Sequence, residues 1–285
     1  MDSPTVLRRR LGSELRRLRE GAKLQAKSAA DSLGFSATKV SRIESGQTTL
    51  KESDVRAMLE LYGVTDEAEL RQFITLTRRS TQRGWWHDYG DTLPEWFQTY
   101  VGLEADASQI RSYESELVPG LFQTASYARE IFRTAQWKQL DDDAIERRIK
   151  LRMQRQEIVR DPAALTVHAV VSEAVLRRPV GGADVMGQQV NHLIEVAQQS
   201  NVTIQVLPFS AGAHPAMGTN FRILSFSEVP GDIVFSEALT SSLYLEKQSD
   251  ISWHESVFDQ LTTLALTPED SMAWLHTLAA KEYTA

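Results

Sequence analysis

The side chains with the clearest chemistry lie between residues 38 and 43. The hydrogen-bond donors among them are Thr38, Lys39, Ser41 and Arg42. They alternate with Val40 and Ile43, whose spacing is that of a buried helix face. Arginine can pair with guanine through two hydrogen bonds, serine and threonine are less selective, and lysine reaches phosphates or bases. Such a face could read the base edges of DNA, or it could be an ordinary solvated helix surface.

The residues around this stretch predict two short helices joined by a tight turn. The apolar positions of the first helix are Leu24, Ala29, Ala30 and Leu33. Gly34 falls where a helix ends with positive φ, Ser36 can cap the next helix, and Gly46 can end it. A pair of helices joined this way is the layout of a helix-turn-helix, whose second helix enters the major groove. The order of these residues favours DNA binding over a solvated hairpin.

Three further helices are expected around this pair, at residues 5–20, 51–61 and 66–77. The first is rich in arginine, which could rest on phosphates and add affinity with little sequence information, although a solvated position is favoured for any single arginine. We expect Lys27, Ser36 and Gln47 to steady the module on phosphates. The bases would then be read by Thr38, Lys39, Ser41 and Arg42.

Residues 5–64 resemble the Xre/Cro-type helix-turn-helix domain, a five-helix DNA-binding fold shared with phage repressors. The matching positions are Leu24, Ala30, Leu33, Gly34, Ser36, Val40, Ser41, Arg42, Ile43, Glu44 and Gly46. The family usually has Thr-Gln where this chain has Gln25 and Ala26, so we expect a weaker helix cap at Gln25 and question the family's phosphate contact at Ala26. The resemblance also implies that Glu44 serves the fold rather than DNA.

The composition is that of a globular protein with room for two domains. The chain has 285 residues, 42% of them hydrophobic and 24% charged, and no cysteine. Residues 1–80 hold 15 Lys and Arg against 11 Asp and Glu, a net +4, while the remainder holds 16 and 27, a net −11. A basic module joined to an acidic body agrees with one domain that touches phosphate. With no apolar run long enough to span a bilayer, we expect a cytoplasmic protein without membrane contact.

The predicted domains are a helix-turn-helix domain at 1–80 and an effector and dimerisation domain at 81–285. The boundary lies in the polar stretch 78–84. Trp85 and Trp86 follow it and could form a ligand platform, but an anchoring role in packing is favoured. The predicted fold class is α+β, with an all-α N-terminal domain and a larger domain whose small sheet is mainly antiparallel.

The second domain is predicted to mix strands with helices. Strands are expected at 108–116, 165–171, 202–207, 221–226 and 232–237, with a weaker one at 242–245. Helices are expected at 93–106, 125–133, 142–160, 172–176, 183–199, 249–265 and 269–281. Three aspartates at 141–143 could suggest a metal, but a negatively charged helix start is favoured because it suits the helix dipole.

A second set of residues resembles the effector domain of a large actinobacterial regulator group called Scr1-type, WhiJ-like or antitoxin-like. These residues are Tyr113, Glu114, 117–124, Tyr127, Ala128, Arg152, Arg155, Gln156, Glu173, Leu176, Arg177, 206–209, Gly212 and Glu237. The resemblance implies that this domain engages a very small partner protein, often encoded nearby, which modulates DNA binding.

No catalytic layout stands out in the sequence. The six histidines are scattered, and the His-Glu-x-x-His, Gly-x-Ser-x-Gly and phosphate-loop patterns are absent. The loop 208–218 could flank a pocket with His214 as its polar handle, but a flexible loop is favoured. Glu114, Glu173 and Glu237 could meet at strand ends, which the sequence alone does not decide. We therefore predict no enzyme, no metal and no cofactor.

The sequence as a whole predicts a sequence-specific transcriptional regulator, of the repressor kind, that binds double-stranded DNA as a homodimer. Its C-terminal domain would dimerise and bind a small partner protein or ligand. The alternative is an antitoxin-like partner-binding protein or small-molecule sensor, in which the C-terminal domain is the main functional unit.

Overall fold

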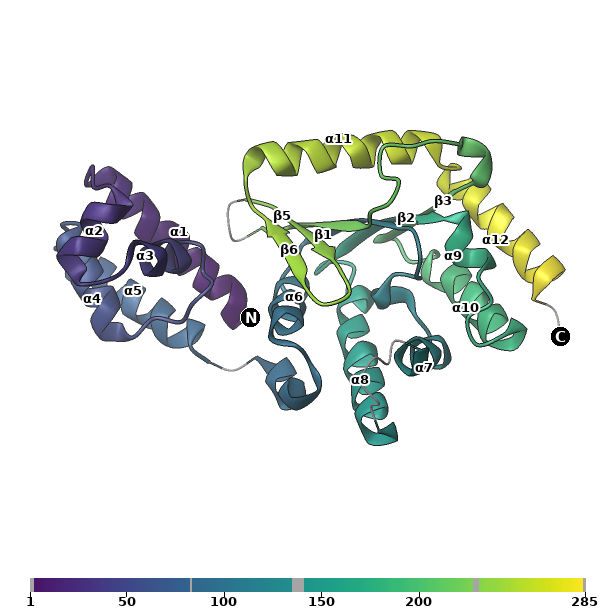
Figure 1. Cartoon of the computed structure of the whole chain (residues 1–285), viewed down its shortest axis with the longest axis horizontal. Helices are drawn as coiled ribbons and strands as arrows, with labels where there is room; N and C mark the ends of the chain where they lie inside the picture. The colour runs from purple at the N-terminus through teal and green to yellow at the C-terminus, as the bar shows by residue number, and fades with distance from the viewer. Residues whose placement is uncertain (1–2, 83, 135–140, 228–230, 284–285) are drawn as a thin grey trace. The chain divides into compact units, whose positions relative to one another are not determined.

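The structure is a computed structural model, and it describes residues 3–82, 84–134, 141–227 and 231–283. The chain divides into two compact units, an N-terminal one ending at His87 and a C-terminal one beginning at Asp88. Figure 1 shows the N-terminal unit as helices and the C-terminal unit as a sheet with helices packed against it. Within the described residues, no helix is both long and apolar enough to span a bilayer.

The N-terminal unit contains the five predicted helices. They are α1 (Pro4–Gly21), α2 (Ala26–Leu33), α3 (Ala37–Glu44), α4 (Glu52–Leu61) and α5 (Glu67–Ser80). Their apolar stripes meet in one core, which includes Leu11, Leu15, Ile43, Val55, Met58, Leu59 and Phe73. The expected cap at Asp66 is present, since its carboxylate accepts the N–H of Ala68 at 2.9 Å.

Helix α5 is longer than the predicted 66–77. Its last turn is buried, and the Ser80 hydroxyl donates to the Thr77 carbonyl at 2.8 Å. Arg8 of α1 also donates to the Ser80 carbonyl at 3.2 Å, which satisfies a carbonyl that the helix end would leave open. The extension therefore depends on a contact from α1. Beyond it, Trp86 is buried, in agreement with a packing role, whereas Trp85 is only partly buried.

The C-terminal unit is α+β, as predicted, and its sheet has six strands. The strands are β1 (Gln109–Glu114), β2 (Thr166–Ser172), β3 (Val202–Leu207), β4 (Phe221–Ser225), β5 (Ile233–Glu237) and β6 (Ser242–Leu245). The helices are α6 (Glu95–Glu104), α7 (Ala125–Thr134), α8 (Asp142–Arg155), α9 (Glu173–Arg177), α10 (Ala183–Val196), α11 (Gln248–Leu264) and α12 (Pro268–Glu282). Figure 1 shows α11 along one face of the sheet, with α6, α8 and α10 on the other side.

The strand order is β3-β2-β1-β4-β5-β6, and the sheet is mixed. The pairings of β1 with β4, β4 with β5 and β5 with β6 are antiparallel, which agrees with a mainly antiparallel sheet. Strands β1, β2 and β3 are parallel to one another, because helical crossovers link them. The carboxyl ends of β1, β2, β3 and β5 consequently lie along the same edge of the sheet.

The start and the end of helix α8 each have a clear structural cause. Asp141 accepts the N–H of Ala144 at 2.7 Å, so the charged start of α8 acts as a cap, as favoured over a metal site. The helix predicted at 142–160 is α-helical only to Arg155 and continues as a 3₁₀ helix over Gln156–Arg160. At the change, the Gln156 side chain donates to the carbonyls of Gly120 and Gln123.

Candidate nucleic-acid interface

The turn between α2 and α3 has the geometry that the sequence predicts. Gly34 has φ 66°, and the next N–H, from Phe35, donates to the Ala30 carbonyl at 2.9 Å. The Ser36 hydroxyl accepts the N–H of Lys39 at 3.1 Å and so caps α3. Gly46, with φ 70°, follows the end of α3. The expectation for Gln25 also holds, since no side-chain cap bond forms at the start of α2.

Helix α3 is held against α1 by backbone contact at two glycines. A Cβ atom added at Gly12 would lie 2.4 Å from the Ile43 carbonyl oxygen. One added at Gly46 would lie 2.6 Å from the Cα of Arg9. Neither position has room for a side chain, so α1 fixes where α3 ends. Gly12 carries no local signal of this contact, because nothing next to a glycine within a helix shows which helix crosses it.

A buried ion pair fixes the same crossing. Arg19 of α1 donates through Nε and Nη2 to the two Glu44 oxygens, at 2.6 and 2.9 Å. Both side chains are at most 9% exposed, and Arg19 also donates to the Leu24 carbonyl at 2.6 Å. The hydrogen bond to Glu44 raises the pKa of Arg19 above its ordinary value. Glu44 thus serves the fold, as predicted, and Arg19 faces inward rather than toward phosphates.

The predicted contact residues lie on the outer side of this motif, with one difference. Six of the seven side chains are exposed, namely Lys27, Ser36, Thr38, Ser41, Arg42 and Gln47. Lys39 is half-buried, with its Nζ 3.0 Å from the Asp54 carboxylate and 3.4 Å from the centre of the Phe35 ring. A base contact by Lys39 would require it to leave these two partners. The DNA contacts of all seven residues stay a prediction.

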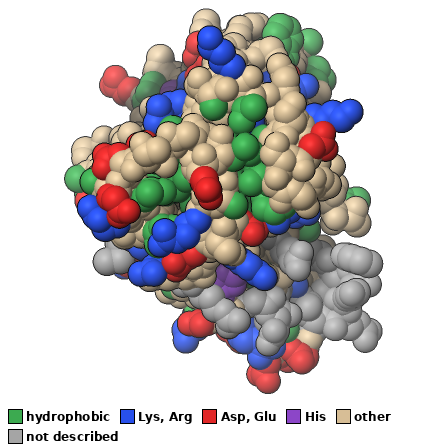
Figure 2. Space-filling view, turned by 90° about the vertical axis from the view of Figure 1, so that its left-hand side faces the viewer, with side chains coloured by type: hydrophobic (Ala, Val, Ile, Leu, Met, Phe, Trp, Pro, Cys, Tyr) green, Lys and Arg blue, Asp and Glu red, His purple; other side chains and the backbone are tan. Residues whose placement is uncertain are grey.

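On the face shown in Figure 2, basic side chains do not gather in one continuous patch. Figure 2 shows basic side chains interspersed with acidic and hydrophobic ones on the face that it presents. On α1, the exposed Arg16 and Arg17 pair with Glu20 and Glu14, each at 2.9 Å. Exposed pairs of this kind hold their partners weakly, so these arginines can exchange a carboxylate for a phosphate.

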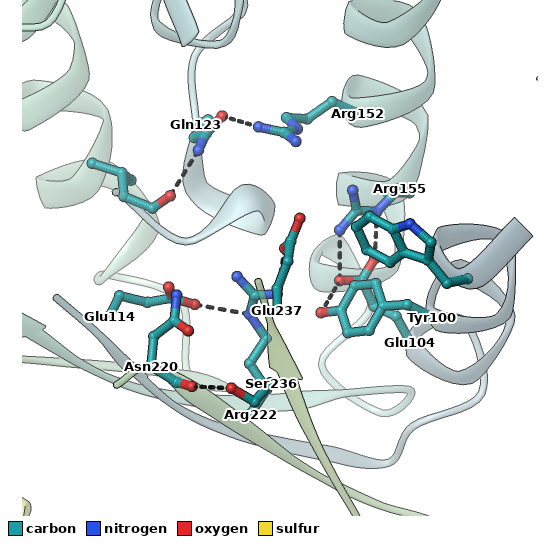
Figure 3. A network of polar contacts seen from close by, with 12 residues as sticks. Tyr100, Glu104, Glu114, Gln123, Arg152, Arg155, Asn220, Arg222, Ser236 and Glu237 are labelled. Carbon is teal, nitrogen blue, oxygen red and sulfur yellow. Dashed lines mark hydrogen bonds and ion pairs between the residues drawn. The ribbon is translucent and has the colours of Figure 1, made fainter. Parts of the chain in front are cut away.

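A second concentration of charge lies inside the C-terminal unit, where side chains far apart in the sequence converge (Figure 3). Arg155 of α8 donates to both oxygens of Glu104, at 2.6 and 2.8 Å, and Tyr100 donates to the same carboxylate at 2.7 Å. Arg222 of β4 donates to Glu114 at 2.8 Å. Residues singled out by the second resemblance, including Glu114, Gln123, Arg152, Arg155, Gln156 and Glu237, therefore contribute to one network.

The two buried carboxylates of this network have opposite pKa shifts. Burial raises the pKa of Glu114, and the Arg222 guanidinium only partly offsets that effect. For Glu104 burial acts in the same direction, but Arg155 and the Tyr100 hydroxyl outweigh it and lower the pKa. Glu104 is therefore the firmly ionised member. The sequence analysis missed both Glu104 and Arg222, which carry no local signal of their distant partners.

Of the three glutamates that the sequence could bring together at strand ends, Glu114 and Glu237 lie near the same arginine and Glu173 does not. Arg222 lies between Glu114 and Glu237, at 2.8 and 3.9 Å. Glu173 instead accepts a hydrogen bond from Arg177 at 2.6 Å and another from the N–H of Phe209 at 2.8 Å. In the loop 208–218, His214 Nε2 lies 3.3 Å from the Tyr113 hydroxyl, and burial lowers the pKa of His214. Among described residues, no three acidic, histidine or cysteine side chains form a group suited to a metal ion.

The comparison with known protein families gives the identity of the larger unit. Residues 97–277, more than half of the chain, match the model of a domain of unknown function, DUF5753. The chain belongs to the DUF5753 family. Residues 10–73 match the model of a helix-turn-helix domain, which supports a DNA-binding regulator. No curated protein and no solved structure matches the chain. The DUF5753 match covers the whole sheet and the charged network, but carries no assigned function.

Proposed function

We propose that this DUF5753 protein is a sequence-specific transcriptional regulator whose helix α3 enters the major groove of DNA. The observation that supports it most is the exposed polar face of a helix whose position is fixed by backbone contact with α1. Thr38, Ser41 and Arg42 would reach base edges from that face. Lys27, Ser36 and Gln47 would contact phosphates and set the orientation of the module.

The experiment selects binding sites for the full-length protein from random DNA and then compares variants on the selected site. We expect Arg42→Ala to lose roughly 1–3 kcal/mol of discrimination at one base position, because arginine is the strongest base reader on this face. Arg71→Ala is the matched control, since Arg71 is an exposed arginine on α5 whose partner is Glu67 in the same helix. Unchanged affinity and unchanged base preference in Arg42→Ala would refute the placement of α3 in the groove.

The proposal includes a homodimer, because one such module contacts too little DNA for tight binding and paired modules read two half-sites. The edge strand β6 is the surface that suits a second copy. Residues 238–245 carry no charge, and Leu239 and Leu243 are 98% and 62% exposed. The opposite edge, β3, is occupied by the chain itself, through Val206 bonded to Leu266 and to Ser271 at 2.9 Å.

An uncharged edge strand can pair antiparallel with its own copy about a two-fold axis, whereas proteins usually protect exposed edges with charge. Leu243→Lys should therefore give a monomer by light scattering, while Trp253→Lys, which changes an exposed aromatic residue on α11, should not. If Leu243→Lys leaves a dimer intact, another surface dimerises. If the chain is a monomer throughout, the homodimer itself is refuted.

We further propose that a small partner protein or ligand acts on the DUF5753 domain and changes DNA binding. Its support is the resemblance of this domain to Scr1-type, antitoxin-like regulators, and repression is the expected sign. Genome-wide occupancy of the tagged protein, measured with and without any small neighbouring gene, tests it. Peaks sharing an inverted repeat that change on deletion would support it, while unchanged peaks would remove that partner. An absence of peaks in both strains would favour the alternative, in which the C-terminal domain is the main functional unit.

A further inference from the structure

We propose that the DUF5753 domain binds a small anion, through carboxylate or phosphate oxygens, at Arg152 of α8. This goes beyond the DNA-binding function, since it concerns side chains of the other unit. Three arginines, Arg152, Arg155 and Arg222, belong to the network in Figure 3. Two of them are paired with buried carboxylates, and the third is not.

Arg152 differs from the other two arginines in its partners. Arg155 holds Glu104, and Arg222 holds Glu114. Within the described residues, Arg152 has no carboxylate in ion-pair distance; its Nη1 donates to the neutral amide oxygen of Gln123, and its buried Nε has no hydrogen-bond partner. A guanidinium withdrawn from water without a carboxylate in direct contact is costly. Such an arrangement is retained where a ligand supplies the missing charge.

The surroundings of Arg152 fix its guanidinium and place it, together with that of Arg155, against a glycine. Gln123 is held in place by its own donation to the Val118 carbonyl at 2.7 Å, so its oxygen is turned to Arg152. The ring of Phe132 lies 4.6 Å from the Arg152 Cζ. At Gly120, an added Cβ would lie 3.9 Å from the Arg152 Cζ and 3.6 Å from Arg155 Nη2. The absence of a side chain there leaves both guanidinium groups facing bare backbone.

The network also lies at a distinctive position in the fold. Glu114 and Glu237 are the last residues of β1 and β5, so the network lies beside the carboxyl ends of these strands. Strand β1 is also where the sheet changes, because its neighbours are the parallel β2 and the antiparallel β4. In open sheets with helical crossovers, ligands bind beside carboxyl strand ends where the topology changes.

The electrostatics agree with this geometry. Burial and the neighbouring Arg155 lower the pKa of Arg152 to about 9, because the charges of Glu237 and Glu104, which lie beyond ion-pair distance, offset these effects only in part. Arg152 is still protonated at pH 7 but is the least stabilised cation of the three. A bound anion would offset both effects. Two oxygens of a carboxylate or phosphate match the fork of a guanidinium, whereas a neutral ligand would leave its charge uncompensated.

The test compares Arg152→Met with Arg155→Met in the full chain, by thermal unfolding at pH 7. Four buffers of equal ionic strength are used: chloride alone, phosphate, acetate and citrate. In chloride, we expect Arg152→Met to unfold at or above the wild-type midpoint, because it removes a buried charge that is only partly compensated. Arg155→Met should unfold several degrees lower, because it leaves Glu104 buried without its partner. The wild type should gain several degrees in phosphate or in the carboxylate buffers, and Arg152→Met should gain none.

Each result decides the proposal. A midpoint for Arg152→Met as low as that for Arg155→Met would make Arg152 a structural residue and overturn the anion site. An equal response of wild type and Arg152→Met to every anion would overturn it too. Phosphate and the carboxylates are separate arms, so the one that raises the midpoint identifies the ligand chemistry. None of these outcomes bears on α3, whose test is the base preference of Arg42→Ala.

Discussion

The two units each contain a buried pair in which an arginine grips a glutamate with two hydrogen bonds. In Arg19–Glu44 and in Arg155–Glu104 the shorter bond joins Nε to Oε1 at 2.6 Å, and the second measures 2.9 and 2.8 Å. The surroundings differ. The first pair is closed, since the remaining donor of Arg19 meets the Leu24 carbonyl. The second belongs to a network with an additional arginine, Arg152, that has no carboxylate within ion-pair distance among the described residues.

The difference separates two uses of the same chemistry. In the helix-turn-helix unit the pair joins α1 to the end of α3, and every strong donor in it is satisfied within the fold. In the DUF5753 unit, Arg155 also holds its carboxylate with two hydrogen bonds, while the buried Nε of Arg152 has no partner among the described residues. A buried charge pair alone is weak evidence for stability, but breaking one is costly because the remaining charge stays buried. Removing single partners therefore distinguishes a closed pair from an open site.

The largest expected effect is that of Arg19→Met, which should destabilise the N-terminal unit by about 3–5 kcal/mol because Glu44 would stay buried without its partner. Chemical denaturation followed by circular dichroism measures it. Arg16→Met is the control, since Arg16 pairs with Glu20 on the exposed side of the same helix and should cost about 0–1 kcal/mol. Equal losses in the two variants would mean that Arg19–Glu44 is no stronger than a surface pair.

A smaller effect is expected for Gly12→Ala, which adds a methyl group where α1 crosses α3. Its Cβ would lie 2.4 Å from the Ile43 carbonyl oxygen, so the helices must separate, at a cost of about 1–3 kcal/mol. Gly21→Ala is the matched control, because Gly21 also lies in α1 but has nothing within 4 Å of an added Cβ. Titration of the selected DNA site should show weaker binding for Gly12→Ala only. Equal binding by both variants would show that the crossing does not position α3.

Arg19 and Gly12 also show which features a sequence pattern can predict and which it cannot. Local signals predicted the five helices and the caps at Gly34, Ser36 and Asp66, because a cap depends on residues three or four apart. Gly12 and the Arg19–Glu44 pair depend on which helices cross, which no short pattern contains. For the same reason, the ion pair between Lys39 and Asp54, which are 15 positions apart, could not be predicted. The predicted exposure of the polar side chains on α3 is thus correct for Thr38, Ser41 and Arg42, but not for Lys39.

The C-terminal unit shows the same limit at longer range. Period-two patterns located the strands, but they do not state which strands pair, so the parallel arrangement of β1, β2 and β3 was not foreseen. Within the charged network, Glu114, Gln123, Arg152, Arg155 and Glu237 were noticed through a resemblance. Arg222 and Glu104 were not, because they appear in the sequence as one charged residue in a strand and one near a helix end. Only the fold brings the two groups together.

The smallest expected effect sharpens the comparison within the helix-turn-helix itself, where α3 has a side-chain cap and α2 has none. Ser36 caps α3, whereas Gln25 has the extended backbone of a cap position at α2 but forms no cap bond. Gln25→Ser should therefore stabilise the N-terminal unit by roughly 0.5–1 kcal/mol, since a serine hydroxyl can accept an N–H of the first turn. Removing the existing cap of α3 by Ser36→Ala should destabilise the unit by about 1 kcal/mol. Denaturation midpoints of the two variants measure both effects. A loss of stability in Gln25→Ser would contradict the prediction and show that the Gln25 side chain itself stabilises the unit.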